Sequence, residues 1–531
     1  MANNTTKQRR YPIGIQTFSE IIKGNYVYID KTDIVWQMTQ SAKYVFLSRP
    51  RRFGKSLLTT TLDAYFKGQK TLFEGLKIME LETEWECYPV IHVDLSVAKR
   101  QSSAEELRAT LMWLMNPLCN MYGSDALETS PGKMLNGLIH RAYEQTGKQV
   151  AVIIDEYDAP LLDVLHESEP LDQFRNVMQE FYVQLKANEA KIKFCFITGI
   201  TKFSQLSIFS TINNLLNVTM DPKFSAICGI TQHELVTAMA EDIRLLAEEY
   251  ECTVEEMTEM LKARYDGYHF SRNSEDVYNP FSLMKAFWHK ELGNYWFESG
   301  TPTFLIRQMQ HFHTDITTLE EMTEPSSAFD RPTEAMETAL PLLYQSGYLT
   351  IKDYDRESQL YRISIPNKEV RIGFVEGLLP TYIGLEASGV QKGFALKFWQ
   401  ALKKNDLNMA LEEMKSYLAG LPYVEGFKKK LDAVANKEGF YEWTLYLVFT
   451  MLNVYAHTQV RCAGGRADVV VEMPDAIYVM ELKVDGSARQ ALEQIETKGY
   501  AIPYHTDGRK VVKAGINFSS ETRTITEWLM A

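Results

Sequence analysis

The chain has 531 residues, of which 45% are hydrophobic and 24% charged, and its formal net charge is −13. This length allows about three or four domains, and the composition is typical of an ordinary folded globular protein. The negative charge excludes a general electrostatic attraction to polyanions, so any contact with nucleic acid has to be local.

The six cysteines lie far apart and form no pair at metal-ligand spacing, which favours reduced core thiols in a cytosolic protein over disulfides. The start of the chain, MANNTTKQRRYPIG, has no apolar signal segment, and no run reaches the ~18 apolar residues of a membrane span. We therefore expect a cytoplasmic protein without a membrane partner.

Residues 43 to 199 alternate between apolar strands and amphipathic helices. Strands are expected at AKYVFLS, YPVIHVDLS, KQVAVIIDEYD and IKFCFITGI, and helices at KSLLTTTLDAYF and AEELRATLMWLM. Near-continuous Val and Ile runs separated by helices indicate a parallel sheet covered on both faces. The predicted fold class is α/β.

From about residue 233 to residue 349 the periodicity becomes helical, as in HELVTAMAEDIRLLAEEY, and predicts an accessory region that packs on the first domain. After a further helical stretch to about residue 437, the pattern returns to α/β. There we expect helices over 441–455 and 487–500 and strands near 466–473, 477–484 and 510–518. The predicted domains are 11–235, 236–390 and 391–531.

The segment FLSRPRRFGKSLL joins the first expected strand to its helix and contains Gly54, Lys55 and Ser56. This context is that of a phosphate-binding loop. Backbone N–H groups at a helix N-terminus converge on phosphate oxygens, a lysine reaches the β- and γ-phosphates, and a hydroxyl binds magnesium. Arg49 stands where such a loop normally opens with glycine, which matters only if that position requires a positive φ.

The third expected strand ends in Asp155 and Glu156. Phosphoryl transfer assisted by magnesium needs one carboxylate near the metal and a second that orients the attacking water. Asp158 either joins these two or caps the next turn. Thr198 and Thr201 follow the fourth strand, where they either sense the γ-phosphate or satisfy the strand end.

These segments, with FITGITKFS and STINNLLNVTMDPKFSAICGIT, resemble the AAA-ATPase-like family of gut and anaerobic bacteria, whose members often carry GPRRxGKT loops. The likeness covers residues 11–235 and implies a P-loop NTPase fold with Walker A and Walker B motifs. It implies that Glu156 is catalytic, that Ser56 and Asp155 bind Mg²⁺, and that ATP is the nucleotide. The implied nucleotide-binding residues are Arg51, Arg52, Phe53, Gly54, Lys55, Ser56, Leu57 and Asp155.

Related ATPases often complete their sites with a neighbour's arginine, so the likeness also suggests a homo-oligomer formed on the substrate. No single arginine in this sequence can be chosen for that role.

A second set of charged residues occurs in GRADVVVEMPDAIYVMELK. If the two strands form a hairpin turning at Pro474–Asp475, facing residue numbers sum to 949, and Asp468 faces Glu481 at a Cβ separation of about 5 Å. Lys483 shares the face of Glu481, since the two are two residues apart on a strand. Two carboxylates so close repel each other unless a cation such as Mg²⁺ lies between them. The alternative is an exposed hairpin with a cross-strand Lys–Glu pair.

The segments GRADVVVE, YVMELK, ALEQIETKGYA and GINFS resemble the PD-(D/E)XK nuclease superfamily, in the form often fused to the AAA-ATPase-like domain. The likeness spans residues 394–520 and implies a restriction-endonuclease-like α/β fold. The active centre it implies consists of Asp468, Glu481 and Lys483, supported by Gln494. Asp468 and Glu481 would hold Mg²⁺ or Mn²⁺.

Other side chains near this set remain open in the sequence. Either Gln494 or Gln490 points inward from the following helix, Tyr500 joins the site or lies at the core edge, and Glu442 is either a further metal ligand or a surface residue. Local basic residues at 403–404 and 428–430 either contact nucleic acid or are solvated helix faces.

Three functions follow from these patterns. The first is an ATPase that controls a metal-dependent nuclease acting on DNA or RNA, in defence or mobile-element biology by analogy. The second is a nucleotide-switched sensor or interaction protein whose nuclease-like domain is a docking surface. In the third, Arg49 disables the loop and only the nuclease domain works.

Overall fold

The computed structural model describes residues 9–162, 164–165, 168–202, 214–299, 305, 308–309, 312, 319, 322–331, 336–373, 397–398, 400–401, 404–419, 455–462, 465–473, 475–522 and 524–531. The chain forms two compact units, Met1–Val370 and Arg371–Ala531.

The first unit is built around a five-stranded sheet in the order β2-β3-β4-β1-β5, in which every neighbouring pair is parallel. All residues of β1, β3 and most of β4 are buried, which explains their continuous apolar sequence. The strands are β1 (Tyr44–Ser48), β2 (Val90–Asp94), β3 (Val150–Asp155), β4 (Ile192–Gly199) and β5 (Leu216–Asn217).

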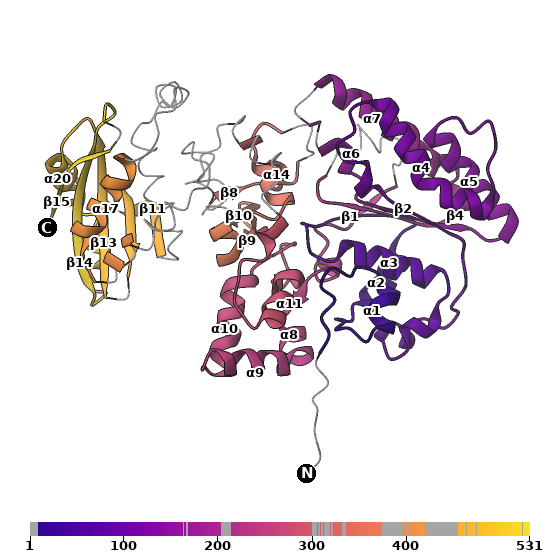
Figure 1. Ribbon diagram of the computed structural model, residues 1–531, viewed down its shortest axis with the longest axis horizontal. Coiled ribbons are helices and arrows are strands. Elements are labelled where there is room, and N and C mark those ends of the chain that lie inside the picture. The colour runs from indigo at the N-terminus through magenta and orange to yellow at the C-terminus, as the bar shows by residue number, and fades with distance from the viewer. Residues whose placement is uncertain are drawn as a thin grey trace, which may run out of the picture. The chain divides into compact units, whose positions relative to one another are not determined.

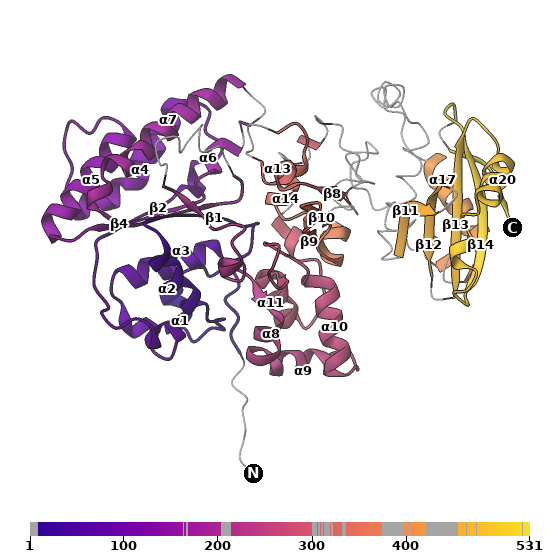
Figure 2. The same cartoon turned by 180° about the vertical axis from the view of Figure 1, so that it is seen from behind.

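Helices cover both faces of this sheet, as the sequence predicts for the α/β class (Figure 1). On one face lie α1 (Phe18–Lys23), α2 (Thr32–Ser41) and α3 (Lys55–Phe66); on the other lie α4 (Ala104–Tyr122), α5 (Pro131–Thr146) and α7 (Ser168–Ala187), with α6 (Ala159–Leu162). The view from behind shows the same layers (Figure 2).

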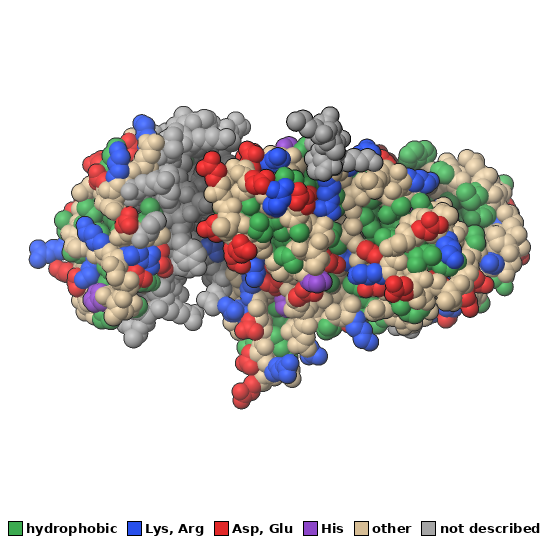
Figure 3. Space-filling view, turned by 90° about the horizontal axis from the view of Figure 1, so that it is seen from below, with side chains coloured by type: hydrophobic (Ala, Val, Ile, Leu, Met, Phe, Trp, Pro, Cys, Tyr) green, Lys and Arg blue, Asp and Glu red, His purple; other side chains and the backbone are tan. Residues whose placement is uncertain are grey.

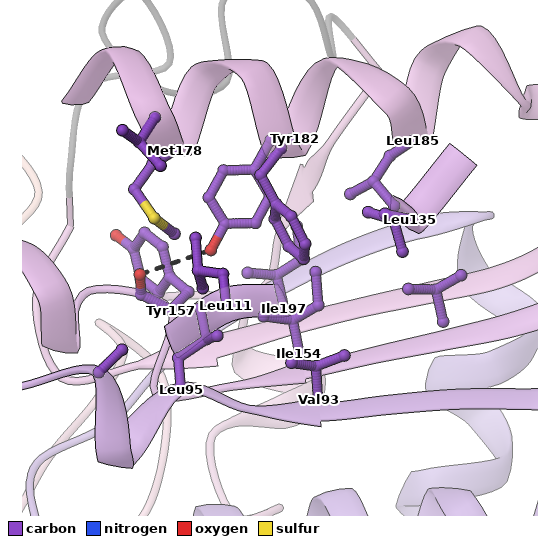
Figure 4. Packing of buried hydrophobic residues seen from close by; sticks show 14 of the residues in the cluster. Val93, Leu95, Leu111, Leu135, Ile154, Tyr157, Met178, Tyr182, Leu185 and Ile197 are labelled. Atoms are coloured by element: carbon purple, nitrogen blue, oxygen red, sulfur yellow. Dashed lines mark hydrogen bonds between the residues drawn. The ribbon is translucent and has the colours of Figure 1, made fainter. Parts of the chain in front are cut away.

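The core of this unit lies between the sheet and α4, α5 and α7. Figure 4 shows side chains of the strands, such as Val93, Ile154 and Ile197, pointing toward Leu111 and Leu135 of the helices. All of these are buried, and each fully buried aliphatic side chain contributes about 1.5–3 kcal/mol.

The accessory region of the first unit is only partly helical. Its helices are α8 (Gln232–Ala238), α9 (Ala240–Glu249), α10 (Val254–Tyr265), α11 (Pro280–His289), α13 (Ser326–Phe329) and α14 (Leu340–Gln345). The continuous helix expected after residue 233 is two helices, because Met239 between them has the non-helical angles φ −124° and ψ 21°.

The accessory region also contains strands that the helical prediction did not include. An antiparallel sheet joins β8 (Met322–Glu324), β10 (Leu360–Ser364) and β9 (Thr350–Asp355), and β6 (Ile230–Thr231) pairs with β7 (Val277–Tyr278). These strands are short, so their period-two pattern is too brief to stand out from the neighbouring helices.

The N-terminal segment ties the accessory helices to the core. Val27 lies in the hydrophobic cluster of the accessory helices, and Tyr11 packs against the same cluster. The Tyr11 hydroxyl donates to Asp242 of α9 at 2.5 Å, and the Lys31 ammonium pairs with Glu234 of α8 at 2.5 Å. Residues that precede the first strand therefore pack against helices that lie more than 200 positions later in the sequence.

The second unit contains a mixed five-stranded sheet in the order β11-β12-β13-β14-β15. Its strands are β11 (Tyr455–Cys462), β12 (Gly465–Glu472), β13 (Ala476–Val484), β14 (Lys510–Phe518) and β15 (Ile525–Met530). Only β13 and β14 are parallel, and α20 (Ala488–Lys498) connects them. The mixed sheet is consistent with the nuclease-like α/β fold that the sequence predicts; the sequence analysis did not predict β11 and β15.

Two helices pack on opposite faces of the second sheet. Buried residues of α17 (Leu407–Ala419) join Val469, Val471 and Met480 in one cluster. Ile495 of α20 joins Val470 and Val479 in another. The alternation of β12 and β13 side chains between the clusters follows the strand period of two.

Among the described residues no helix is long and apolar enough to cross a membrane. Of the cysteines whose side chains are described, five are free thiols: Cys195 and Cys228 are buried, Cys119 and Cys252 are half-buried, and Cys87 is exposed. The expectation of core thiols is thus wrong for Cys87, which lies in the mostly exposed segment before β2.

Glu369 gives the first unit a pH-dependent stability. Burial raises the pKa of its carboxyl to about 7, against the opposing effects of the backbone N–H groups that it accepts and of Arg264. The neutral form is therefore favoured in the folded chain. The stability it contributes is complete below the unfolded pKa of 4.5 and is lost as the pH rises through about 7.

We expect Glu369→Gln to remove this loss, because glutamine keeps an acceptor oxygen and cannot ionise. Between about pH 5 and pH 7 the free energy of unfolding of the wild type should fall relative to the variant by up to about 3 kcal/mol. Thermal unfolding at several pH values measures the difference. Parallel pH profiles of the two proteins would contradict the assignment.

Candidate functional site

The phosphate loop joins β1 to α3. Gly54 precedes the helix with a left-handed φ of +88°, and Lys55 is the first helical residue. The Lys55 amine donates to the carbonyl oxygens of Arg49 at 2.8 Å and Pro50 at 2.9 Å, so it closes the loop upon itself. Burial lowers the pKa of this amine, while the nearby Asp155 and Glu156 raise it.

Arg49 does not need the conformational freedom of the glycine that it replaces. The left-handed residues of the loop are Arg52, with a φ of 70°, and Gly54. Arg49 is not among the residues with positive φ, so a side chain at this position costs no backbone strain.

The Arg49 guanidinium connects the loop to other parts of the first unit. It is 1% exposed and donates to the carbonyl oxygens of Ser48 and Thr219 at 2.9 and 2.8 Å and of Phe224 at 3.1 Å. It also lies over the ring of Phe270, 4.2 Å from the centroid. The side chain therefore joins the loop to the segment after β5 and to the accessory region.

Aromatic side chains of the accessory region surround the loop. Phe53 is 1% exposed and packs edge-on against Tyr268 and Phe270, with centroid distances of 4.7 and 5.4 Å. The exposed Arg52 lies over Phe281 at 4.4 Å. Of the residues that the resemblance assigns to nucleotide binding, Phe53 is thus used for packing, and Leu57 packs beside the cluster of Phe18 and Phe73.

Asp155 ends β3 directly beside the start of α3. Asp155 is 2% exposed, and its carboxylate accepts from the Thr59 hydroxyl at 3.3 Å and from the Glu156 backbone N–H at 2.9 Å. Burial raises its pKa to about 6, although Ser56 and Lys55 lower it. A hydroxyl and a carboxylate near each other are the hard oxygen donors that magnesium prefers, so Ser56 and Asp155 fit the ion that the family implies.

Glu156 follows with a left-handed φ of 48°, which is unusual for glutamate. Its carboxylate pairs with the ammonium of Lys99, which follows the short helix Leu95–Ala98 after β2. The sequence analysis missed Lys99. Its position shortly after the second strand could have indicated it, because the carboxyl ends of parallel strands meet at one edge of the sheet.

The remaining polar residues at this edge serve the fold. Asp158 accepts from the backbone N–H groups of Ile200 and Thr201 at 3.1 and 2.7 Å and from the Thr201 hydroxyl at 2.6 Å. The Thr198 hydroxyl donates to the carbonyl of Leu47 at 2.7 Å. Asp158 therefore holds the end of β4, and both threonines satisfy strand ends.

The second candidate site lies where β12 and β13 separate. Their ladder runs from the pair Val469–Met480 to the pair Glu472–Ile477, so facing numbers sum to 949 as predicted. Asp468 and Glu481 lie one step beyond the last pair. There the Asp468 carboxylate accepts the backbone N–H of Leu482 at 2.8 Å.

Two side chains reach the carboxylate of Glu481, which is 1% exposed, and a third supports one of them. The Gln494 amide of α20 donates to its carboxylate, the Lys483 ammonium lies 3.6 Å from the same oxygen, and Tyr500 accepts from Gln494 at 3.4 Å. Gln494 rather than Gln490 is thus the inward residue.

Asp468 and Glu481 occupy one face of the sheet. Val470 and Val479 pair with each other and both contact the α20 side, and strand alternation continues this face to Asp468 and Glu481. In the described part of the chain no three His, Cys, Asp or Glu side chains form a metal site. Magnesium commonly takes only one or two protein carboxylates with water and phosphate oxygens, so the pair fits this ion.

Several expected contributors lie outside the described residues: Lys403, Glu442 and the lysines at 428–430. Figure 3 shows one face of the molecule, on which acidic and basic side chains are mixed. The basic contacts expected for nucleic acid therefore stay a prediction.

Comparisons with known proteins match both regions. A family model described as "Predicted AAA-ATPase" matches residues 12–209, and one described as "PD-(D/E)XK nuclease superfamily" matches residues 436–528. The chain is also 32% identical, over 529 residues and 98% of both chains, to the "Uncharacterized protein in vnfD 5'region" of Azotobacter chroococcum mcd 1.

We expect Arg49→Met to lower the free energy of unfolding of the first unit by about 3 kcal/mol, since buried carbonyl groups lose a charged donor. Thermal unfolding measures the loss. The matched control is Arg52→Met, whose exposed side chain should matter far less. A result of equal small effects for the two variants would contradict the structural role of Arg49.

Proposed function

The chain belongs to the predicted AAA-ATPase family with a C-terminal PD-(D/E)XK nuclease superfamily domain, and from this premise we propose that ATP binding and hydrolysis in the first unit control metal-dependent cleavage of nucleic acid by the second. The observation that carries the proposal is the convergence of Lys483, Gln494 and the buried Glu481 near Asp468, in a chain that also has a phosphate loop.

In the first unit, Lys55 would exchange its two carbonyl acceptors for phosphate oxygens of ATP. The backbone N–H groups around Gly54, at the start of a 12-residue helix, would donate to the same phosphates. Ser56 and Asp155 would hold a magnesium ion, which neutralises phosphate charge when bound. Glu156 would orient the attacking water after its carboxylate leaves Lys99.

In the second unit, Asp468 and Glu481 would hold a divalent ion that, when bound, lowers the pKa of a coordinated water. The Gln494 amide fixes the orientation of the Glu481 carboxylate. The Lys483 ammonium would steady the nucleophile or offset the negative charge that develops on the phosphodiester.

The biological setting that we propose with this activity is defence against foreign DNA or mobile-element biology, and it rests on analogy with related bacterial systems. Homo-oligomer formation is proposed on the same ground.

Paired variants test the function. Lys55→Ala should lower ATP hydrolysis, and Lys483→Ala should lower nuclease activity with ATP hydrolysis intact, each about a hundredfold or more because each removes a charge that stabilises the transition state. The assays are phosphate release and cleavage of single- and double-stranded DNA and RNA with Mg²⁺ or Mn²⁺. Lys67→Ala at the end of α3 and Lys510→Ala at the start of β14 are matched controls.

Three outcomes are decisive. Cleavage that requires ATP and is lost in both variants supports the coupled enzyme. ATP binding without cleavage under any tested condition overturns it and favours a nucleotide-switched interaction protein. Cleavage that is indifferent to Lys55→Ala would mean that the nuclease works alone.

Lys99 should restrain Glu156. We expect Lys99→Ala to raise basal ATP turnover about fivefold, since a half-buried ion pair of about 1 kcal/mol no longer holds the carboxylate. Lys99→Arg keeps the positive charge and should behave as the wild type. If Lys99→Ala instead loses as much activity as Glu156→Gln, then Lys99 belongs to the catalytic machinery.

A further inference from the structure

Trp296 contacts the phosphate loop from the accessory region. Its side chain is buried, and the indole N–H donates to the carbonyl oxygen of Arg51 at 3.3 Å. The ring packs at 5.1 Å from Tyr348 and at 6.4 Å, edge-on, from Tyr268. This aromatic packing fixes the direction of the indole N–H.

The carbonyl that Trp296 binds belongs to the peptide between Arg51 and Arg52. Arg52 is the non-glycine residue of the loop with a left-handed φ, 70°. In a planar trans peptide the C=O and the following N–H point in opposite directions. By holding the Arg51 carbonyl, the indole therefore sets the direction of the Arg52 N–H, one of the backbone donors of the loop.

Glu369 holds Trp296 from the other side. It is fully buried, and one carboxylate oxygen accepts the backbone N–H groups of Tyr295 at 2.6 Å and Trp296 at 3.0 Å. A carboxyl oxygen accepts hydrogen bonds in both its neutral and its ionised form. The carboxylate thus anchors the backbone that carries the indole.

Glu369 lies next to the point at which the chain leaves the first unit. The first compact unit ends at Val370, and the second begins at Arg371. Three residues therefore connect a loop carbonyl to the place where the chain leaves the first unit: Arg51, Trp296 and Glu369.

A second close contact between the accessory region and the phosphate loop involves Gly347 and Pro50. Gly347 approaches Pro50 so closely that an added Cβ would lie 2.6 Å from the Pro50 Cβ, and its φ is +88°. Because the two residues are packed without free space, a shift of the loop at Pro50 also displaces the accessory region at Gly347.

We propose that Trp296 and Glu369 are positioning residues that orient the phosphate loop and carry its nucleotide state to the segment that enters the second unit. The inference rests on the proposed ATP binding and adds the residues through which that binding is read. A nucleotide that turns the Arg51–Arg52 peptide changes the hydrogen bond between the Trp296 indole and the Arg51 carbonyl. Because Glu369 is bonded to the backbone of Trp296, it then moves together with that backbone.

The test is hydrogen exchange of the full chain with and without Mg-ATP, with the affinity for Mg-ATP measured by calorimetry. In the wild type, Mg-ATP should change the exchange of residues 295–297 and 368–373. In Trp296→Phe, which keeps a ring and lacks the donor, the affinity should fall about fivefold, and the change at 368–373 should disappear. Trp288→Phe, at an exposed tryptophan, is the matched control and should behave as the wild type.

A second pair of variants separates positioning from folding. Glu369→Gln keeps an acceptor and should transmit the change, whereas Glu369→Leu should not. The inference is overturned if the wild type binds Mg-ATP without any change at 368–373, or if Trp296→Phe transmits it fully. A folded wild type that does not bind Mg-ATP would instead overturn the proposed function, and this inference with it.

Discussion

One buried guanidinium, that of Arg49, holds together the parts of the first unit that meet at the phosphate loop. Its donors reach carbonyl groups of β1 and of the segment after β5, and its plane lies on Phe270 of the accessory region. Burial lowers its pKa only to about 10, so it remains charged near neutral pH. A glycine at this position would leave those carbonyl groups without their donor, and the loop would lose its tie to the accessory region.

In both candidate sites, carboxylates are brought together where strands of a sheet end or separate. In the first unit, parallel strands bring Asp155 and Glu156 to the edge where α3 begins. In the second, antiparallel strands separate after Val469 and Met480 and leave two carboxylates beside α20. In both, a lysine lies next to the carboxylates, with Lys55 near Asp155 and Lys483 near Glu481. Charges of opposite sign reduce the cost of burying each other.

The sequence predicted what depends on local pattern. Continuous apolar runs identified β1 to β4, and the turn at 474–475 fixed the register of β12 and β13. It could not predict contacts between distant segments, such as Lys99 with Glu156 or Trp296 with Arg51, because no periodicity links residues 57 or 245 positions apart. The role of Arg49 was hidden for the same reason, since its acceptors lie about 170 residues later.

The central claim is that the loop binds a nucleotide with arginine in place of its first glycine. Calorimetric titration of the folded wild-type chain with ATP, with and without magnesium, tests it most directly. The account predicts saturable binding at one site per chain that is strengthened by magnesium, because the Ser56 hydroxyl and the Lys55 ammonium both lie near the Asp155 carboxylate. The absence of binding heat at any magnesium concentration would contradict it.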